Sequence, residues 1–198
     1  MEMFRHALAP DELRRAERFR FAPDKRRFII SRGILRIILG GYLNMKPDKI
    51  RFRRGPFGKP ELEGNAGLET LCFSASRSNG LALYAFAAGR QIGVDLEYIR
   101  PNFRIGDMAR QFLPPEYNAL LEACPEHDRG KTFFALWCRN EAYLKAQGTG
   151  LAGAPLKPDG QWSFIDLHVG RGYAACLAVK GQGTALKRRR WTGCPPGM

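Results

Sequence analysis

The apolar positions of residues 24–43 predict a long amphipathic helix. They recur at intervals of seven, three and four residues, which is the spacing of one helix face: Phe28, Leu35, Ile38 and Tyr42. The basic side chains of the segment lie off this stripe and predict a basic outer face: Lys25, Arg32 and Arg36. Two shorter helices are expected before it, the second near Pro10, because proline suits a first helical turn.

After a loop rich in proline and glycine, the pattern changes to short strands. Ser-Asn-Gly and Ala-Gly-Arg turn signals separate three of them, which predicts a meander of hairpins at residues 71–74, 81–87 and 91–97. Further helices are expected from about Arg104, from Pro115 and over residues 128–147, where Asp128 can cap the start and Gly148 the end. The last predicted strands cover residues 162–167 and 172–179.

The order of helices, strands, helices and strands predicts an α+β fold. The chain has 198 residues, of which 44% are hydrophobic, so it is long enough for two small lobes that each have a core. We place the boundary at Tyr98, which gives an N-terminal lobe of residues 1–98 and a C-terminal lobe of residues 99–198.

Composition narrows the class of protein. The most apolar stretch, residues 29–43, is too short to span a membrane and contains two arginines. The N-terminus lacks the basic-then-apolar order of a secretion signal, so a cytoplasmic location is expected. Five scattered cysteines without a CxxC or Cys/His pair predict reduced thiols rather than disulfides or a zinc site.

The charge of the chain is strongly basic and unevenly distributed. The net charge is +13, and residues 1–60 hold sixteen Lys and Arg against six Asp and Glu. Such a field favours an anionic partner, which can be nucleic acid, a polyphosphate cofactor or an acidic protein. Charge alone leaves all three open.

Two carboxylates share one face of the strand at residues 92–97. Side chains alternate along a strand, so Asp95 and Glu97 lie opposite Ile92, Val94 and Leu96. Adjacent carboxylates repel unless a cation neutralises them, and one or two such oxygens, completed by substrate phosphates, commonly hold Mg²⁺. The hexapeptide taken alone also fits a solvated edge strand.

A second candidate site lies on the helix at residues 128–147. Trp137, Glu141 and Lys145 are four residues apart and therefore lie on one face. Taken alone, a glutamate four residues before a lysine also fits an ordinary surface ion pair.

Together these segments resemble the 4′-phosphopantetheinyl transferases. The ordered motifs are a GVDLE strand, an FLPPEY turn and a W-x-R-N-E-A-Y-L-K helix. The likeness is to the larger, two-lobed, monomeric type that modifies carrier proteins of nonribosomal peptide and polyketide synthases. It extends over most of the chain, through an opening helix, a second helix, a GKP loop, an F-N-x-S-H-S-like segment and a closing strand at residues 9–19, 24–36, 58–60, 73–78 and 172–175.

The resemblance implies two similar lobes related by a pseudo-twofold axis. Each would be a small, mainly antiparallel sheet packed with helices, and the active site would lie at the lobe interface. The implied reaction moves the 4′-phosphopantetheine arm of coenzyme A to a serine hydroxyl of an apo acyl or peptidyl carrier protein. It depends on Mg²⁺ and releases 3′,5′-ADP.

The resemblance also assigns roles to individual residues. Asp95, Glu97 and Glu141 match the family's three metal-binding acids, and Glu141 or Glu97 would accept the serine proton. Lys145 matches the lysine on the pyrophosphate. The positions that would bind the coenzyme are Arg15, Arg27, Lys59, Ser76, Arg77 and Lys145.

Three departures from the family pattern bear on activity. The histidine near the coenzyme's 3′-phosphate is Arg77 here, and arginine is a competent phosphate fork. The lysine before the helical glutamate is Asn140, which removes a cation beside the phosphates. Only about twenty residues separate Leu151 from Gly172, which is fewer than usual in the family. An inactive member that binds coenzyme A or a carrier therefore stays open as an alternative.

The rival from another class is a basic nucleic-acid-binding module that uses the arginine-rich helices and the KRRR tail. The sequence has no zinc finger, RNP-like strand or recognition helix, and this rival leaves the three acids without a purpose. Under the transferase reading, the basic first third would attract an acidic carrier, and the carrier could dock on Phe112, Leu113 and Tyr117. We expect a monomer, because one chain supplies both lobes.

Overall fold

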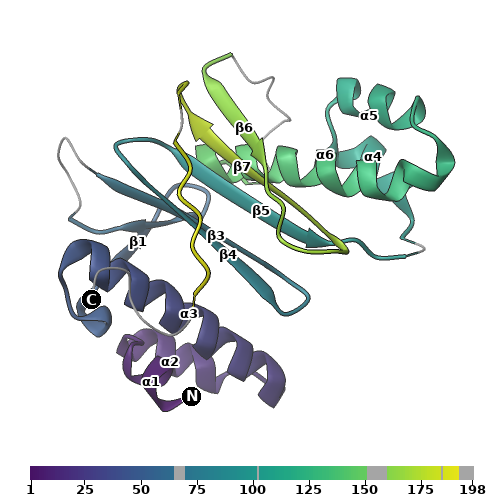
Figure 1. The fold of residues 1–198 in the computed structure, drawn as a ribbon. Helices are drawn as coiled ribbons and strands as arrows, with labels where there is room; N and C mark the ends of the chain where they lie inside the picture. Colours follow the sequence, from purple (N-terminus) through teal and green to yellow (C-terminus); the bar gives the residue numbers. More distant parts are fainter. Residues whose placement is uncertain (65–69, 102, 151–159, 184, 192–198) are drawn as a thin grey trace. The chain divides into compact units, whose positions relative to one another are not determined.

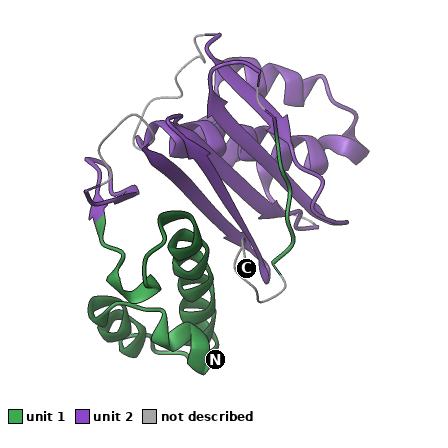
Figure 2. Ribbon diagram, turned by 60° about the vertical axis from the view of Figure 1, so that its left-hand side comes forward, with its two compact units in different colours: residues 1–52, 186–198 green, residues 53–185 purple. Residues whose placement is uncertain are grey.

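The structure is a computed structural model that describes residues 1–64, 70–101, 103–150, 160–183 and 185–191. These residues belong to two compact units, one of residues 1–52 with 186–198 and one of residues 53–185 (Figure 2). These units differ from the two lobes predicted from the sequence, whose boundary at residue 98 remains a prediction. It falls inside the second unit because strands from both sides of it pair there.

The first unit is helical. It contains three α-helices and a 3₁₀ turn: α1 (Glu2–His6), α2 (Pro10–Glu17), α3 (Ala22–Leu43) and η1 (Pro47–Lys49). Helix α3 ends where Asn44 adopts a left-handed conformation. The predicted helix over residues 24–43 is therefore confirmed, with two more residues at its start.

The face assigned to α3 from the sequence is wrong at two positions. Tyr42, predicted on the buried stripe, is exposed. Arg36, predicted on the basic outer face, is only 2% exposed. It is buried because the carboxylate of Glu12 on α2 accepts a hydrogen bond from its Nε at 2.5 Å.

The second unit combines small antiparallel sheets with helices, which confirms the α+β class. Its strands are β1 (Phe52–Arg54, which begins at the unit boundary), β2 (Pro60–Leu62), β3 (Leu71–Ser78), β4 (Leu81–Ala88), β5 (Ile92–Tyr98), β6 (Trp162–Asp166) and β7 (Tyr173–Lys180). Its helices are α4 (Ile105–Phe112), α5 (Pro115–Glu122) and α6 (Glu126–Gln147). Helix α6 begins two residues before the predicted cap Asp128, after Pro125, and ends at Gly148 as predicted.

The strands do not form the predicted meander. β3 and β4 form an antiparallel hairpin, but β5 pairs with β7 in a separate sheet of order β5-β7-β6 (Figure 1). The turn signals after β4 correctly marked a chain reversal. They could not indicate that β5 would take a partner about eighty residues further along the chain.

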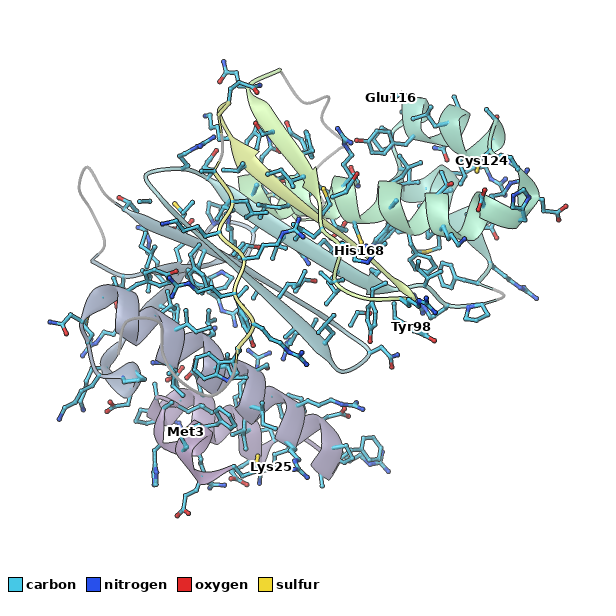
Figure 3. The ribbon with its side chains drawn as sticks, in the orientation of Figure 1. Met3, Lys25, Tyr98, Glu116, Cys124 and His168 are labelled. Carbon is cyan, nitrogen blue, oxygen red and sulfur yellow. The ribbon has the colours of Figure 1, made fainter. Side chains whose placement is uncertain are left out.

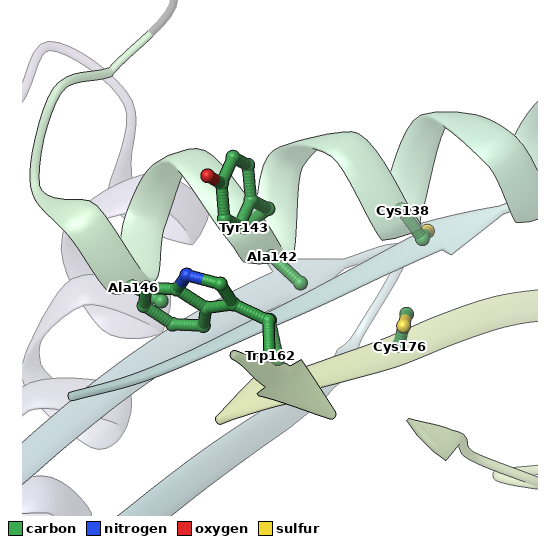
Figure 4. Packing of buried hydrophobic residues seen from close by; sticks show 7 residues of the cluster. Cys138, Ala142, Tyr143, Ala146, Trp162 and Cys176 are labelled. Carbon is green, nitrogen blue, oxygen red and sulfur yellow. The ribbon is translucent and has the colours of Figure 1, made fainter. Parts of the chain in front are cut away.

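Helix α6 packs across β5 and β7, and the contact forms one of the hydrophobic clusters of the second unit (Figure 4). Small side chains make this close approach possible: Cys138, Ala142, Ala146 and Cys176 are at most 1% exposed. Burial raises the pKa of both thiols, that of Cys176 to about 12, so they stay uncharged at neutral pH. Cys194 lies outside the described residues. No described helix is both long and apolar enough to cross a membrane.

Gly93 of β5 lies directly against the backbone of α6. A Cβ atom at this position would lie 2.0 Å from the Ala142 carbonyl oxygen and 2.4 Å from the Ala146 nitrogen. The GVDLE motif therefore needs its glycine because the helix backbone occupies the space of a side chain.

We expect Gly93→Ala to push α6 away from β5 and to lower the free energy of unfolding by about 1–3 kcal/mol, the usual cost of overpacking. Chemical denaturation would measure this loss. Gly130→Ala is the control, because a Cβ at that glycine of the same helix has no atom within 4 Å. Equal stability of the Gly93→Ala variant and the wild type would contradict the close packing.

Candidate active site

Asp95 is a buried carboxylate at the centre of the second unit. It is 2% exposed, which excludes the solvated edge-strand reading for this residue. Its Oδ1 accepts hydrogen bonds from the Ser76 hydroxyl at 2.9 Å and from the Lys145 ammonium at 2.5 Å. Its Oδ2 is buried and has no partner among the described residues.

Lys145 connects the helix to the strand. Its Nζ donates to Asp95 and, at 3.1 Å, to the Ser76 hydroxyl. The ion pair runs from α6 to β5, so Lys145 is not simply one half of a surface pair with Glu141. About one third of the Lys145 side chain remains exposed, and its charge offsets that of Asp95.

Glu141 and Glu97 are partly buried acids beside this pair. Burial is the main cause that raises the pKa of Glu141, and the charge of Asp95 raises it further while Lys145 lowers it. Burial also raises the pKa of Glu97, whereas a hydrogen bond from the Ser78 hydroxyl at 2.9 Å lowers it. Oε1 of Glu141 is buried without a partner in the described part of the chain.

These acids have the donor chemistry that Mg²⁺ prefers, although they do not form a closed cage. Among the described residues, no group of three or more His, Cys, Asp or Glu side chains is arranged to hold a metal ion. Mg²⁺ usually takes only one or two protein carboxylates and completes its shell with water and substrate phosphates. The unpartnered oxygens of Asp95 and Glu141 are therefore a fit for a hard cation that arrives with a polyphosphate.

Lys59 lies in the same unit but contacts backbone rather than the acids. Its Nζ donates to the carbonyl oxygens of Ala146 at 2.9 Å and Ile92 at 3.2 Å. Burial lowers the pKa of this ammonium. These contacts join the end of α6 to the start of β5, so Lys59 orients the two elements that carry the acids. Its predicted contact with the coenzyme stays a prediction.

The other predicted basic residues are exposed or belong to the helical unit. The Arg15 guanidinium lies over the ring of Phe28, 5.2 Å from its centroid. Arg27 is exposed and pairs with Asp24 at 3.3 Å. Arg77 is exposed on β3, where strand alternation directs it away from the face of Ser76. Their predicted roles toward the coenzyme are untested.

Of the docking residues considered near α4 and α5, Leu113 is buried and the other two are partly buried. Leu113 is 3% exposed and Tyr117 packs against its cluster, while the ring of Phe112 contacts that of Trp137. Leu113 therefore does not offer the exposed docking surface considered from the sequence. Asn140 is also buried, and its side-chain amide donates to the Phe112 carbonyl oxygen at 3.4 Å. In place of a cation, this position therefore carries a link between α6 and the end of α4.

Ser74 and Ser78, whose hydroxyls accept backbone N–H groups of β5, were not identified from the sequence. With Ser76 they occupy alternate positions of β3, and the acids of β5 are also two residues apart. This shared period of two was the available signal. The hydroxyls lie beside β5, which ends at Tyr98, labelled in Figure 3.

Two family models match this chain. One, described as the 4′-phosphopantetheinyl transferase superfamily, matches residues 91–192, and one described as 4′-phosphopantetheinyl transferase, N-terminal, matches residues 1–88. Three curated proteins illustrate the similarity. The chain is 40% identical to the 4′-phosphopantetheinyl transferase HetI of Nostoc sp. over 189 residues, which is 89% of this chain and 80% of HetI.

The two other proteins are more distant. The L-aminoadipate-semialdehyde dehydrogenase-phosphopantetheinyl transferase of Xenopus laevis is 28% identical over 83% of this chain and 57% of its own length. The 4′-phosphopantetheinyl transferase Sfp of Bacillus subtilis is 27% identical over 82% of this chain and 73% of its own length.

Proposed function

This chain belongs to the 4′-phosphopantetheinyl transferase superfamily, and from that premise we propose that it transfers the 4′-phosphopantetheine arm of coenzyme A, with Mg²⁺, to a serine hydroxyl of an apo acyl or peptidyl carrier protein. Membership confirms the family and the enzyme class that the sequence predicts. The observation that carries the proposed mechanism is the cluster of buried Asp95 with the partly buried Glu97, Glu141 and Lys145, in which two carboxylate oxygens have no partner among the described residues.

In the proposed reaction, the serine oxygen of the carrier forms a new bond to the phosphorus that bears the pantetheine arm. The bond from that phosphorus to the oxygen of the departing 3′,5′-ADP breaks, and the serine proton moves to a base. We assign the base to Glu141, because its Oε1 has no partner among the described residues whereas Ser78 donates to Oε2 of Glu97. One oxygen of Glu141 would bind the metal and the other would accept the proton. Burial raises the pKa of Glu141, which makes its carboxylate a better proton acceptor.

The acids and Lys145 would also hold the metal ion and neutralise charge on the phosphates. Asp95, Glu97 and Glu141 would hold Mg²⁺, which when bound would offset the charge of the pyrophosphate. Lys145 already pairs with Asp95 and also lowers the pKa of Glu141, so it is placed to offset charge on the leaving group. Alignment and charge neutralisation are the main requirements of phosphoryl transfer.

The proposal also covers the lobes, the coenzyme contacts and the carrier protein. The two family models meet between residues 88 and 91, close to the predicted lobe boundary at residue 98, which supports a division of the chain near that point. Two similar lobes with the site between them are part of the proposal. Arg15, Arg27, Lys59, Ser76 and Arg77 are proposed to contact the coenzyme. The basic first third is proposed to attract an acidic carrier. A monomeric state and a cytoplasmic location remain predictions.

The decisive experiment is intact-mass spectrometry of an apo carrier protein after incubation with this protein, coenzyme A and Mg²⁺. We expect the mass increment of one phosphopantetheine, its loss with a chelator and its return when Mg²⁺ is restored. An increment that persists after complete removal of divalent cations would overturn the metal assignment. Binding of coenzyme A without any increment across several acidic carriers would indicate an inactive member. Binding of nucleic acid that is independent of Mg²⁺, with no coenzyme binding, would favour the nucleic-acid module.

A further inference from the structure

Three serines on β3 bond to β5 in place of backbone carbonyls. β3 and β5 belong to different hydrogen-bonded sheets. The hydroxyl oxygens of Ser74, Ser76 and Ser78 accept the backbone N–H groups of Val94, Leu96 and Tyr98 at 3.1, 3.3 and 2.9 Å. Each step of two residues on β3 matches a step of two on β5, so the strands run side by side in the same direction. We call these three residues the serine ladder.

The serine ladder also contacts the acids. A hydroxyl has one hydrogen to donate. Ser76 donates it to Oδ1 of Asp95 and Ser78 donates it to Oε2 of Glu97, each at 2.9 Å. The hydroxyl oxygens of Ser76 and Ser78 also accept the N–H of the residue that follows each acid on β5. Both serines are therefore bonded to the backbone of β5 and to a carboxylate.

Ser74 does not donate to a carboxylate of β5, and the sequence explains why. Ser74 accepts the N–H of Val94, and the residue that precedes Val94 is Gly93, which has no side chain. The chain thus contains the same backbone link with and without a carboxylate. This difference separates the structural use of the serine ladder from any effect on the acids.

We propose that two residues of the serine ladder position the acids: Ser78 is a positioning residue for Glu97 and Ser76 for Asp95. One oxygen of each carboxylate accepts a hydrogen bond from a serine that is itself bonded to β5. The other oxygen is thereby oriented toward the metal ion and the coenzyme's phosphates. The proposal rests on the proposed function, because this orientation matters only if the acids bind a metal ion. Partners that orient a ligating carboxylate typically contribute about 10- to 100-fold to metal affinity or activity.

The test compares Ser78→Ala with Ser74→Ala and Ser78→Thr in the full chain. Mn²⁺ is titrated into each protein with saturating coenzyme A and followed by its paramagnetic resonance signal, with coenzyme A alone as the blank. We expect Ser78→Ala to weaken Mn²⁺ binding by about 10-fold or more. Ser74→Ala should stay close to the wild type, and Ser78→Thr should restore binding because it keeps the hydroxyl.

Two further measurements complete the test. Hydrogen exchange should speed up at the Tyr98 amide in Ser78→Ala and at the Val94 amide in Ser74→Ala, because each loses its acceptor. The Mg²⁺ concentration at half-maximal transfer should rise only in Ser78→Ala. Both alanine variants are compared at temperatures where thermal melts show them folded.

The outcomes separate the two proposals. Equal Mn²⁺ binding by the two alanine variants would overturn the positioning role and leave the serine ladder as a structural link. Failure of the wild type to bind Mn²⁺ with coenzyme A would overturn it as well. Failure of the wild type to transfer phosphopantetheine, with Mn²⁺ binding still weakened only by Ser78→Ala, would overturn the proposed function and support the serine ladder.

Discussion

Replacing Glu141 by glutamine is expected to lower the turnover of phosphopantetheine transfer by about 10²- to 10⁴-fold, the usual contribution of a general base. The glutamine is nearly the same size, so α6 keeps its packing on β5. It cannot accept the serine proton, however, and it is a weaker metal ligand than a carboxylate. The loss should appear in the turnover number at saturating coenzyme A and carrier protein.

The same change is expected to stabilise the ligand-free protein. Burial is the main cause that raises the pKa of Glu141, so the ionised carboxylate is less favourable in the folded protein than in water. The amide carries no charge for burial to penalise. Stability and activity therefore oppose each other at this position, as at many binding sites. For a chain of this size, each kcal/mol recovered corresponds to about 2–4 °C in melting temperature.

The stability difference between the Glu141→Gln variant and the wild type is expected to depend on pH. Burial raises the pKa of Glu141, so the folded protein holds this proton more tightly than the unfolded chain does. The stabilising contribution of the protonated acid is fully present below the unfolded pKa and is lost as pH rises through the raised folded pKa. The difference in melting temperature between the Gln variant and the wild type should therefore widen from acid to neutral pH.

Glu126→Gln is the matched control, because Glu126 is an exposed glutamate in the first turn of the same helix. It should alter neither turnover nor the pH dependence of stability appreciably. Retention of wild-type turnover by Glu141→Gln would remove this residue from the proposed role of base. A difference in melting temperature that does not change with pH would contradict the buried, unpartnered carboxylate.

The candidate acids could be located from the sequence because local periods determine their faces. The period of two places Asp95 and Glu97 on one side of β5, and the period of 3.6 places Glu141 and Lys145 on one side of α6. Hydrophobic burial then brings the two elements together. Family resemblance indicated that these acids act together, and the bond between Lys145 and Asp95 joins the two elements. The role of Lys145 on the pyrophosphate stays a prediction.

The features that the sequence did not predict depend on pairings between distant segments. Lys59 contacts Ala146, which is 87 residues away, and β5 pairs with β7 rather than with its neighbour β4. Local pattern places Arg36 on a polar face, and only the carboxylate of Glu12 explains its burial. A polar residue can be buried wherever a partner satisfies it, and no local period identifies that partner.

Replacing Glu12 by glutamine is expected to lower the free energy of unfolding of the helical unit by about 3–5 kcal/mol, the cost of breaking a buried ion pair. The Glu12 carboxylate accepts from the guanidinium groups of Arg32 and Arg36 and, at 3.1 Å, from the Ala9 amide. Glu12 and Arg36 are 5% and 2% exposed. The Arg36 guanidinium also donates to the Pro47 and Ile50 carbonyl oxygens, which hold it in place. Removal of the Glu12 charge therefore leaves the two guanidinium groups side by side without a negative charge to compensate them.

Glu17→Gln on the same helix is the matched control, because Glu17 also pairs with two basic residues, Arg5 and Lys25, but is about half exposed. Solvent screens that cluster, so its loss should shift the denaturation curve far less. Denaturant unfolding followed by hydrogen exchange at α2 and α3 would localise the loss to the helical unit. Equal, small effects of the two substitutions would mean that the Glu12 cluster is solvated. A large effect of Glu12→Gln alone would show that the buried Glu12 and Arg36, with the partly buried Arg32, determine how α2 and α3 pack.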